Sequence, residues 1–102
     1  AGVAWIEFSS NFNIISKIVR RMVWDEGFNA AVAVNRNFSN MAQLYVRFRN
    51  PSPVIARLIP ELKAKGFNAG GKDDVMGAVC PKNRVDEAIR VVEEVLGCES
   101  LL

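Results

Sequence analysis

The spacing of hydrophobic and polar residues changes several times along the chain, and each change marks the end of an expected helix or strand. Three segments carry apolar side chains at helical spacing: residues 12–23, 53–62 and 85–96. Four segments have the composition or the alternation of strands: residues 3–8, 30–34, 41–49 and 75–80. Gly27 and Gly97 end the first and last helices, and Pro60 should kink or split the middle one.

The order of these segments predicts an α/β fold. It runs strand, helix, strand, strand, helix, glycine loop, strand, helix, with the glycine loop at residues 66–71. This order is typical of a two-layer sandwich, here with a mixed β-sheet of about four to five strands and about three helices. Residues 30–34 are almost all apolar, as in a strand covered on both faces, and a polar turn joins them to residues 41–49. We expect a single domain over residues 1–102.

Composition limits the chemistry that this chain can perform. Its 102 residues are enough for one hydrophobic core, and a net charge of +2 does not by itself indicate a nucleic-acid partner. Histidine is absent, which removes the most common general base and metal ligand. Cys80 and Cys98 are expected to be free thiols of a cytoplasmic protein. We predict no catalytic residue, no metal ligand and no membrane span in this chain.

The strand at residues 41–49 has two different faces. Leu44, Val46 and Phe48 share the apolar face, and the other face carries a polar row: Gln43, Tyr45, Arg47 and Arg49. The side chains of this row are about 7 Å apart, since a strand rises by a little over 3 Å per residue. Arginine binds phosphate and tyrosine stacks on bases, so the row suits a single strand of nucleic acid. A solvated sheet face would have a similar composition.

The glycine-rich stretch is the second candidate site. Gly70 and Gly71 allow a tight turn and the close approach of a ligand to backbone N–H groups, and Lys72 adds a cation. The spacing differs from that of the phosphate-binding loop of NTPases. Asp73 and Asp74, without a further ligand, are a weak indication of a metal site. A plain glycine turn before a strand is the alternative interpretation.

Residues 70–78, GGKDDVMGA, resemble position for position the pattern Gly-Gly-His-Pro-x-Ala-Ala-Gly-Ala of the DHH-associated (DHHA) domain. This domain is the C-terminal module of DHH phosphoesterases, which include RecJ-like exonucleases and oligoribonucleases. The segment RFRN is similar to the family's Ser-Leu-Arg-Ser, which aligns Arg49 with a substrate-contacting arginine. The first helix with the strand after it, and Pro81 with the closing helix, extend the resemblance over almost the whole chain. Lys72 stands where the family has histidine, and Asp73 where it has proline.

The resemblance implies a function in nucleic-acid binding. It implies that this chain is the C-terminal part of a larger, metal-dependent phosphodiesterase or exonuclease, and that it grips the phosphate backbone of its substrate. The implied partner is single-stranded nucleic acid or a short oligonucleotide. Six residues are the implied binding residues: Tyr45, Arg47, Arg49, Gly70, Gly71 and Lys72. Catalysis would belong to a separate N-terminal DHH domain with divalent metal ions, normally manganese.

Two other functions remain open. Some DHH relatives are inactive replisome scaffolds that bind GINS-type partners, and the replacement of the family histidine by Lys72 is compatible with that role. Outside the family, a ferredoxin-like regulatory domain that binds a small ligand and dimerises would also have a glycine loop between its elements.

Overall fold

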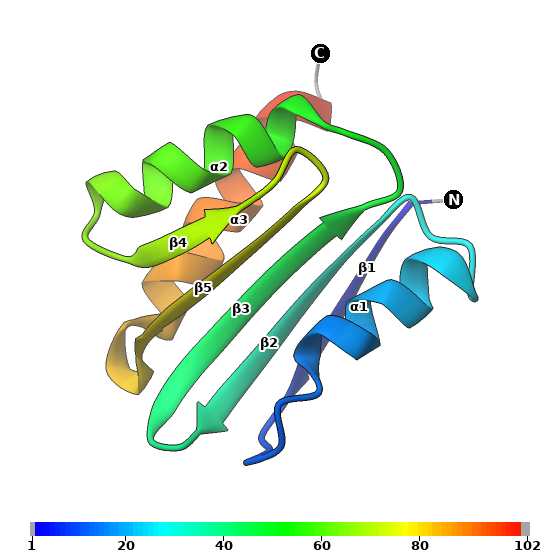
Figure 1. Ribbon diagram of the computed structural model, residues 1–102. Helices are drawn as coiled ribbons and strands as arrows, with labels where there is room; N and C mark the ends of the chain where they lie inside the picture. Colours follow the sequence, from blue (N-terminus) through cyan, green and yellow to red (C-terminus); the bar gives the residue numbers. More distant parts are fainter. Residues whose placement is uncertain (1, 101–102) are drawn as a thin grey trace.

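The computed structural model describes the backbone of residues 2–100 and the side chains of residues 2–97, and it contains one mixed β-sheet with three α-helices (Figure 1). This finding confirms the predicted α/β sandwich. The elements follow the expected order, with a short 3-10 helix, η1, before the last helix. They are β1 (Val3–Phe8), α1 (Ile15–Trp24), β2 (Ala30–Phe38), β3 (Met41–Phe48), α2 (Pro53–Ala64), β4 (Asn68–Gly71), β5 (Val75–Pro81), η1 (Lys82–Arg84) and α3 (Val85–Ser100).

The strand order in the sheet is β1-β2-β3-β5-β4. β1 and β2 are parallel neighbours joined through α1, and the other neighbouring pairs are antiparallel. A ferredoxin-like domain is built from split βαβ units, in which another strand lies between the parallel pair, so the topology differs from that alternative. The predicted glycine loop is also corrected, because Asn68–Gly71 pairs with β5 and forms an edge strand.

Helices cover the two faces of the sheet unequally. On one face, Val19 and Val23 of α1 pack against a cluster that includes Ala31 and Ala33 of β2. On the other face, α2 and α3 enclose the larger core, to which β2 contributes Val32 and Val34. β2 is therefore covered on both faces, as its apolar sequence predicted. β4 and β5 keep the two-layer arrangement, and α1 adds a third layer over the other end of the sheet (Figure 1).

A buried polar pair fixes the loop that leads into α1. The Asn35 side chain is fully buried; its Oδ1 accepts from the Ser10 backbone N–H at 3.0 Å, and its Nδ2 donates to the Ser10 carbonyl at 2.9 Å. Nδ2 also lies 3.3 Å from Oε1 of Gln43, whose Nε2 donates to Asn13 at 3.4 Å. Because buried amides are costly without partners, these bonds hold the loop, and thus the start of α1, against the sheet.

α2 begins as the sequence predicts but continues through its proline. The Ser52 hydroxyl accepts from the Val54 N–H at 3.1 Å, and Pro53 occupies the first turn. The expectation that Pro60 splits this segment is wrong, since one helix spans Pro53–Ala64. Pro60 and Ala56, whose carbonyl loses its helical donor, are both exposed, so water can supply the missing hydrogen bond.

Candidate nucleic-acid interface

The half of the sheet formed by β3, β5 and β4 is open on the side of α1. α1 packs against β3 and reaches Tyr45, and among the described residues no helix covers β5 and β4 on this face. Beside α1, the three strands border a hollow of about 340 Å³, which we call the glycine groove. Gly70 and Gly77 leave its centre without side chains, and the side chains around them belong to Gln43, Tyr45, Asn68, Val75 and Val79. No described residue lining the glycine groove is charged. The hollow is therefore suited to an uncharged, flat group.

The strand register places three residues of the glycine groove side by side. Tyr45 of β3 pairs with Gly77 of β5, and Gly77 pairs with Gly70 of β4. Directly paired residues point to the same face of a sheet, so one cross-strand row contains a phenol ring followed by two positions without side chains. Backbone atoms are thus accessible beside an aromatic ring.

Glycine stands at three positions of this region for different structural reasons. A Cβ at Gly77 would lie 2.6 Å from Cε1 of Tyr45, so this glycine makes room for the tyrosine ring. A Cβ at Gly71 would lie 2.1 Å from the Val75 carbonyl oxygen, so this glycine is required by the β4–β5 hairpin. A Cβ at Gly70 would meet nothing within 4 Å, and its φ lies outside the left-handed region. Packing does not require glycine at position 70, where its effect is to leave the floor open.

Arg47 lies on β3 two residues beyond Tyr45 and pairs with Val75 of β5. Its side chain is 17% exposed, and its Nη1 is 3.7 Å from Oδ2 of Asp74. This separation exceeds the 2.7–2.9 Å typical of a charge-assisted hydrogen bond. The Nε of Arg47 is buried without a hydrogen-bond partner. The guanidinium is therefore only loosely held by its carboxylate neighbour.

The tip of the β4–β5 hairpin is fixed to the segment that follows β3. The N–H groups of Phe48 and Ser52 donate to the carbonyls of Asp74 and Asp73, at 2.8 and 3.0 Å. Lys72 is exposed, and its backbone N–H donates to the Val75 carbonyl at 2.8 Å. These bonds hold the hairpin tip, with Lys72, at the end of β3 that carries Arg47.

Arg49 is directed elsewhere. Its Nη2 donates to the carbonyl of Val23, near the end of α1, and its guanidinium lies 5.4 Å from the centroid of the Trp24 ring. A cation at the C-terminal end of a helix is favourable, because the last carbonyls lack helical donors. Arg49 thus fastens α1 to β3, and it does not line the glycine groove.

The structure brings most of the predicted residues together. Tyr45, Gly70 and Gly71 line the glycine groove, with Arg47 and Lys72 at one end. Sequence reasoning missed two residues near it. Asn68 falls within the expected glycine loop at residues 66–71, and Trp24 lies just beyond the expected helix at residues 12–23. The position of Trp24 was a usable signal, since it lies opposite the apolar stripe of α1 and is 51% exposed.

No group of three or more potential ligands is placed to hold a metal ion within the part of the chain that the structure describes. Cys80 is a buried free thiol, and burial raises its pKa above the ordinary value. Since the thiolate is the reactive form, Cys80 is suited to packing. Cys98 lies outside the described side chains. Among the described helices, none is long and apolar enough to cross a membrane.

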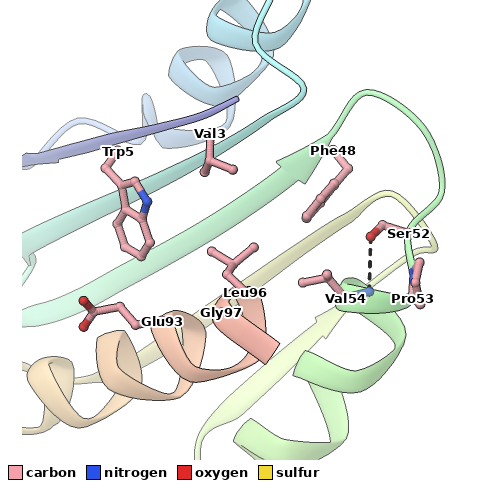
Figure 2. Close-up of a pocket in the computed structure, with 9 residues that line it drawn as sticks. All are labelled: Val3, Trp5, Phe48, Ser52, Pro53, Val54, Glu93, Leu96 and Gly97. Atoms are coloured by element: carbon pink, nitrogen blue, oxygen red, sulfur yellow. Dashed lines mark hydrogen bonds between the residues drawn. The ribbon is translucent and has the colours of Figure 1, made fainter. Parts of the chain in front are cut away.

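A second and larger hollow, about 640 Å³, lies on the opposite face of the sheet; we call it the apolar groove. Figure 2 shows Val3 and Trp5 of β1 facing Leu96 and Glu93 of α3, with Phe48 near its other end. The Ser52 hydroxyl at its rim already caps α2. The walls are mainly apolar side chains, and none of the six predicted binding residues lines this hollow.

Compared with the models of known protein families and with curated proteins, the chain matches none of them.

Proposed function

We propose that this chain is a nucleic-acid-binding accessory domain of a DHH-type phosphoesterase and acts in the cytoplasm. The glycine groove accepts the base and sugar of a single strand or short oligonucleotide, and Arg47 and Lys72 bind its phosphates. The observation that carries the proposal is Gly70, a glycine that the fold does not require, on the floor of an open sheet face. A separate DHH domain with divalent metal, normally manganese, supplies catalysis.

A base in the glycine groove can contact both the flat floor of the groove and the unpaired edge of β4. A planar base can lie against the backbone of Gly70, beside the ring of Tyr45 that covers Gly77, and such stacking contributes about 1–3 kcal/mol per base. The outer edge of β4 is unpaired among the described strands, so its outward N–H and C=O groups can bond to the ligand. Every base has a flat face, so this mode of binding is tolerant of sequence.

The phosphates of the ligand would bind at the end of the glycine groove where Arg47 and Lys72 lie. Lys72 is exposed and makes no ion pair within the described residues. The Arg47 guanidinium can exchange its loose contact with Asp74 for a bidentate bond to phosphate, the geometry that arginine forms most readily. A rotation that gives the buried Nε an acceptor would also recover part of the roughly 1–3 kcal/mol that an unmade buried bond costs.

Fluorescence anisotropy with labelled short single-stranded DNA and RNA tests this proposal. In Gly70→Val, a branched side chain fills the floor, and we expect binding to weaken by about tenfold or more, while the thermal midpoint does not fall. Gly97→Ala is the control, because a Cβ there also meets nothing within 4 Å but lies beside the apolar groove. Equal affinities of Gly70→Val and the wild type would contradict the proposal.

A further inference from the structure

The outer face of α1 carries a cluster that the glycine groove does not use. Arg20 and Arg21 each lie three or four residues from both Lys17 and Trp24, so these four side chains form one cluster on the helix surface. All four are exposed and lie away from the buried stripe of α1. Together with Asp25 they border a shallow hollow of about 400 Å³. We call these four residues the α1 patch.

The positive charge of the α1 patch is not neutralised within the described residues. Two arginines on other helical segments have acidic partners on the same segment or the next: Arg57 pairs with Glu61 at 3.0 Å, and Arg84 pairs with Glu87 at 3.1 Å. Lys17 and Arg21 are instead like charges at i,i+4, an arrangement that destabilises a helix by a few tenths of a kcal/mol. Asp25 is the one carboxylate among the residues lining this hollow. An anionic partner would remove the repulsion.

Trp24 adds an aromatic surface to these cations. Its side chain is 51% exposed, and the Arg49 guanidinium holds it by a cation–π contact at 5.4 Å. Arg49 is itself bonded to the Val23 carbonyl, so the indole is fixed from the side of the sheet. A held, half-exposed ring surrounded by cations is the arrangement on which single-stranded nucleic acid stacks.

Arg49 also connects the α1 patch to the glycine groove. Tyr45, Arg47 and Arg49 lie on the same face of β3 and its extension, about 7 Å apart, and the last of them contacts Trp24. The row thus leads from the floor of the groove to the outer face of α1. We propose that the α1 patch is a second contact for the same ligand, in which Lys17, Arg20 and Arg21 bind phosphates and Trp24 stacks on a base.

This inference rests on the proposed function and narrows it. A dinucleotide can occupy the glycine groove alone, whereas a strand of several nucleotides reaches both sites. The preferred ligand is therefore a single-stranded oligonucleotide or polynucleotide, bound more tightly as its length grows. Its affinity should also fall steeply with salt, because each phosphate contact releases condensed counterions.

The test compares a labelled dinucleotide with a single strand of about twelve nucleotides. In Arg20→Gln/Arg21→Gln we expect the longer strand to bind about tenfold or more weakly at about 50 mM salt, and the salt slope to fall by about 1.4. Dinucleotide binding should not change. The control is Lys63→Gln/Lys65→Gln, which removes the same charge from exposed positions at the end of α2. It should leave both affinities unchanged.

Fluorescence gives an independent measurement. The chain has two tryptophans, so Trp5→Phe leaves Trp24 as the sole indole. We expect the longer strand to quench this emission and the dinucleotide to leave it unchanged. If Arg20→Gln/Arg21→Gln binds both ligands like the wild type, the α1 patch is no contact and the proposed function stands. If neither ligand binds the wild type, the proposed function fails and this inference with it. If Arg20→Gln/Arg21→Gln loses binding only to phosphatidylserine vesicles, the α1 patch is a membrane contact and the inference is overturned.

Discussion

The glycine groove and the apolar groove are two uncovered parts of the same sheet, on opposite faces and toward opposite edges. α1 leaves β5 and β4 open on one face, and α2 and α3 leave β1 open on the other. The apolar groove is the larger, at about 640 Å³ against about 340 Å³. Volume therefore does not distinguish a candidate site here. The two hollows are distinguished by the side chains that their strands direct into them.

The two hollows differ in what a ligand would meet. In the apolar groove, Trp5 and Val3 are 43% and 42% exposed, so an occupant would gain chiefly by burying apolar surface. In the glycine groove, an occupant meets backbone atoms, a phenol ring and two cations at one end. Such a surface suits a planar, uncharged group that carries an anionic group at the charged end of the hollow. Substitutions that change one hollow and leave the other intact test this difference.

The largest effect is expected on stability, in a comparison of Gly71, which the β4–β5 hairpin requires, with Gly70, which packing does not require. Gly71→Ala places a Cβ against the Val75 carbonyl and should lower the free energy of unfolding by about 3 kcal/mol. Gly70→Ala should leave that free energy unchanged or slightly raise it, because its Cβ meets open space. Urea unfolding of the two variants measures the difference. Equal loss of stability in both would show that Gly70 is also required by the fold.

The next effect compares the aromatic residues of the two grooves. Tyr45→Leu removes a stacking surface and should weaken binding of a short oligonucleotide by about five- to a hundredfold, whereas Tyr45→Phe keeps the ring and the affinity. Trp5→Leu, in the apolar groove, should bind like the wild type. Anisotropy titrations measure all three. A larger loss in Trp5→Leu than in Tyr45→Leu would move the binding site to the apolar groove.

The fold follows from patterns that are local in sequence. Helical spacing located α1, α2 and α3, and the apolar run at residues 30–34 predicted a strand covered on both faces. Errors arose where local chemistry was ambiguous. Glycines at residues 70 and 71 suggested a loop, but pairing with β5 makes them a strand. The predicted turn after β2 shortens to Ser39 and Asn40, whose positive φ angles allow a two-residue hairpin turn.

The candidate site was only partly visible in the sequence. Alternation on β3 placed Tyr45, Arg47 and Arg49 on one face, and the structure keeps that row. Alternation does not say which neighbour a long side chain reaches, so the contact of Arg49 with the end of α1 was not foreseen. The pairing of Tyr45 with Gly77 depends on the register between strands that are more than thirty residues apart. Such non-local register cannot be read from spacing along one segment.

A smaller effect is expected from the charge at the end of the glycine groove. Arg47→Gln removes one phosphate contact, so short-oligonucleotide affinity should fall about three- to tenfold at about 50 mM salt and less at about 200 mM. The salt slope should decrease by about 0.7. Arg57→Gln is a charge-matched control on α2, where the arginine is paired with Glu61. Arg47 is only 17% exposed and lies 3.7 Å from Asp74, so thermal midpoints of the variants must be compared in parallel. An unchanged salt slope in Arg47→Gln would mean that phosphate is bound elsewhere, and that the charged end of the glycine groove is no more functional than the apolar groove.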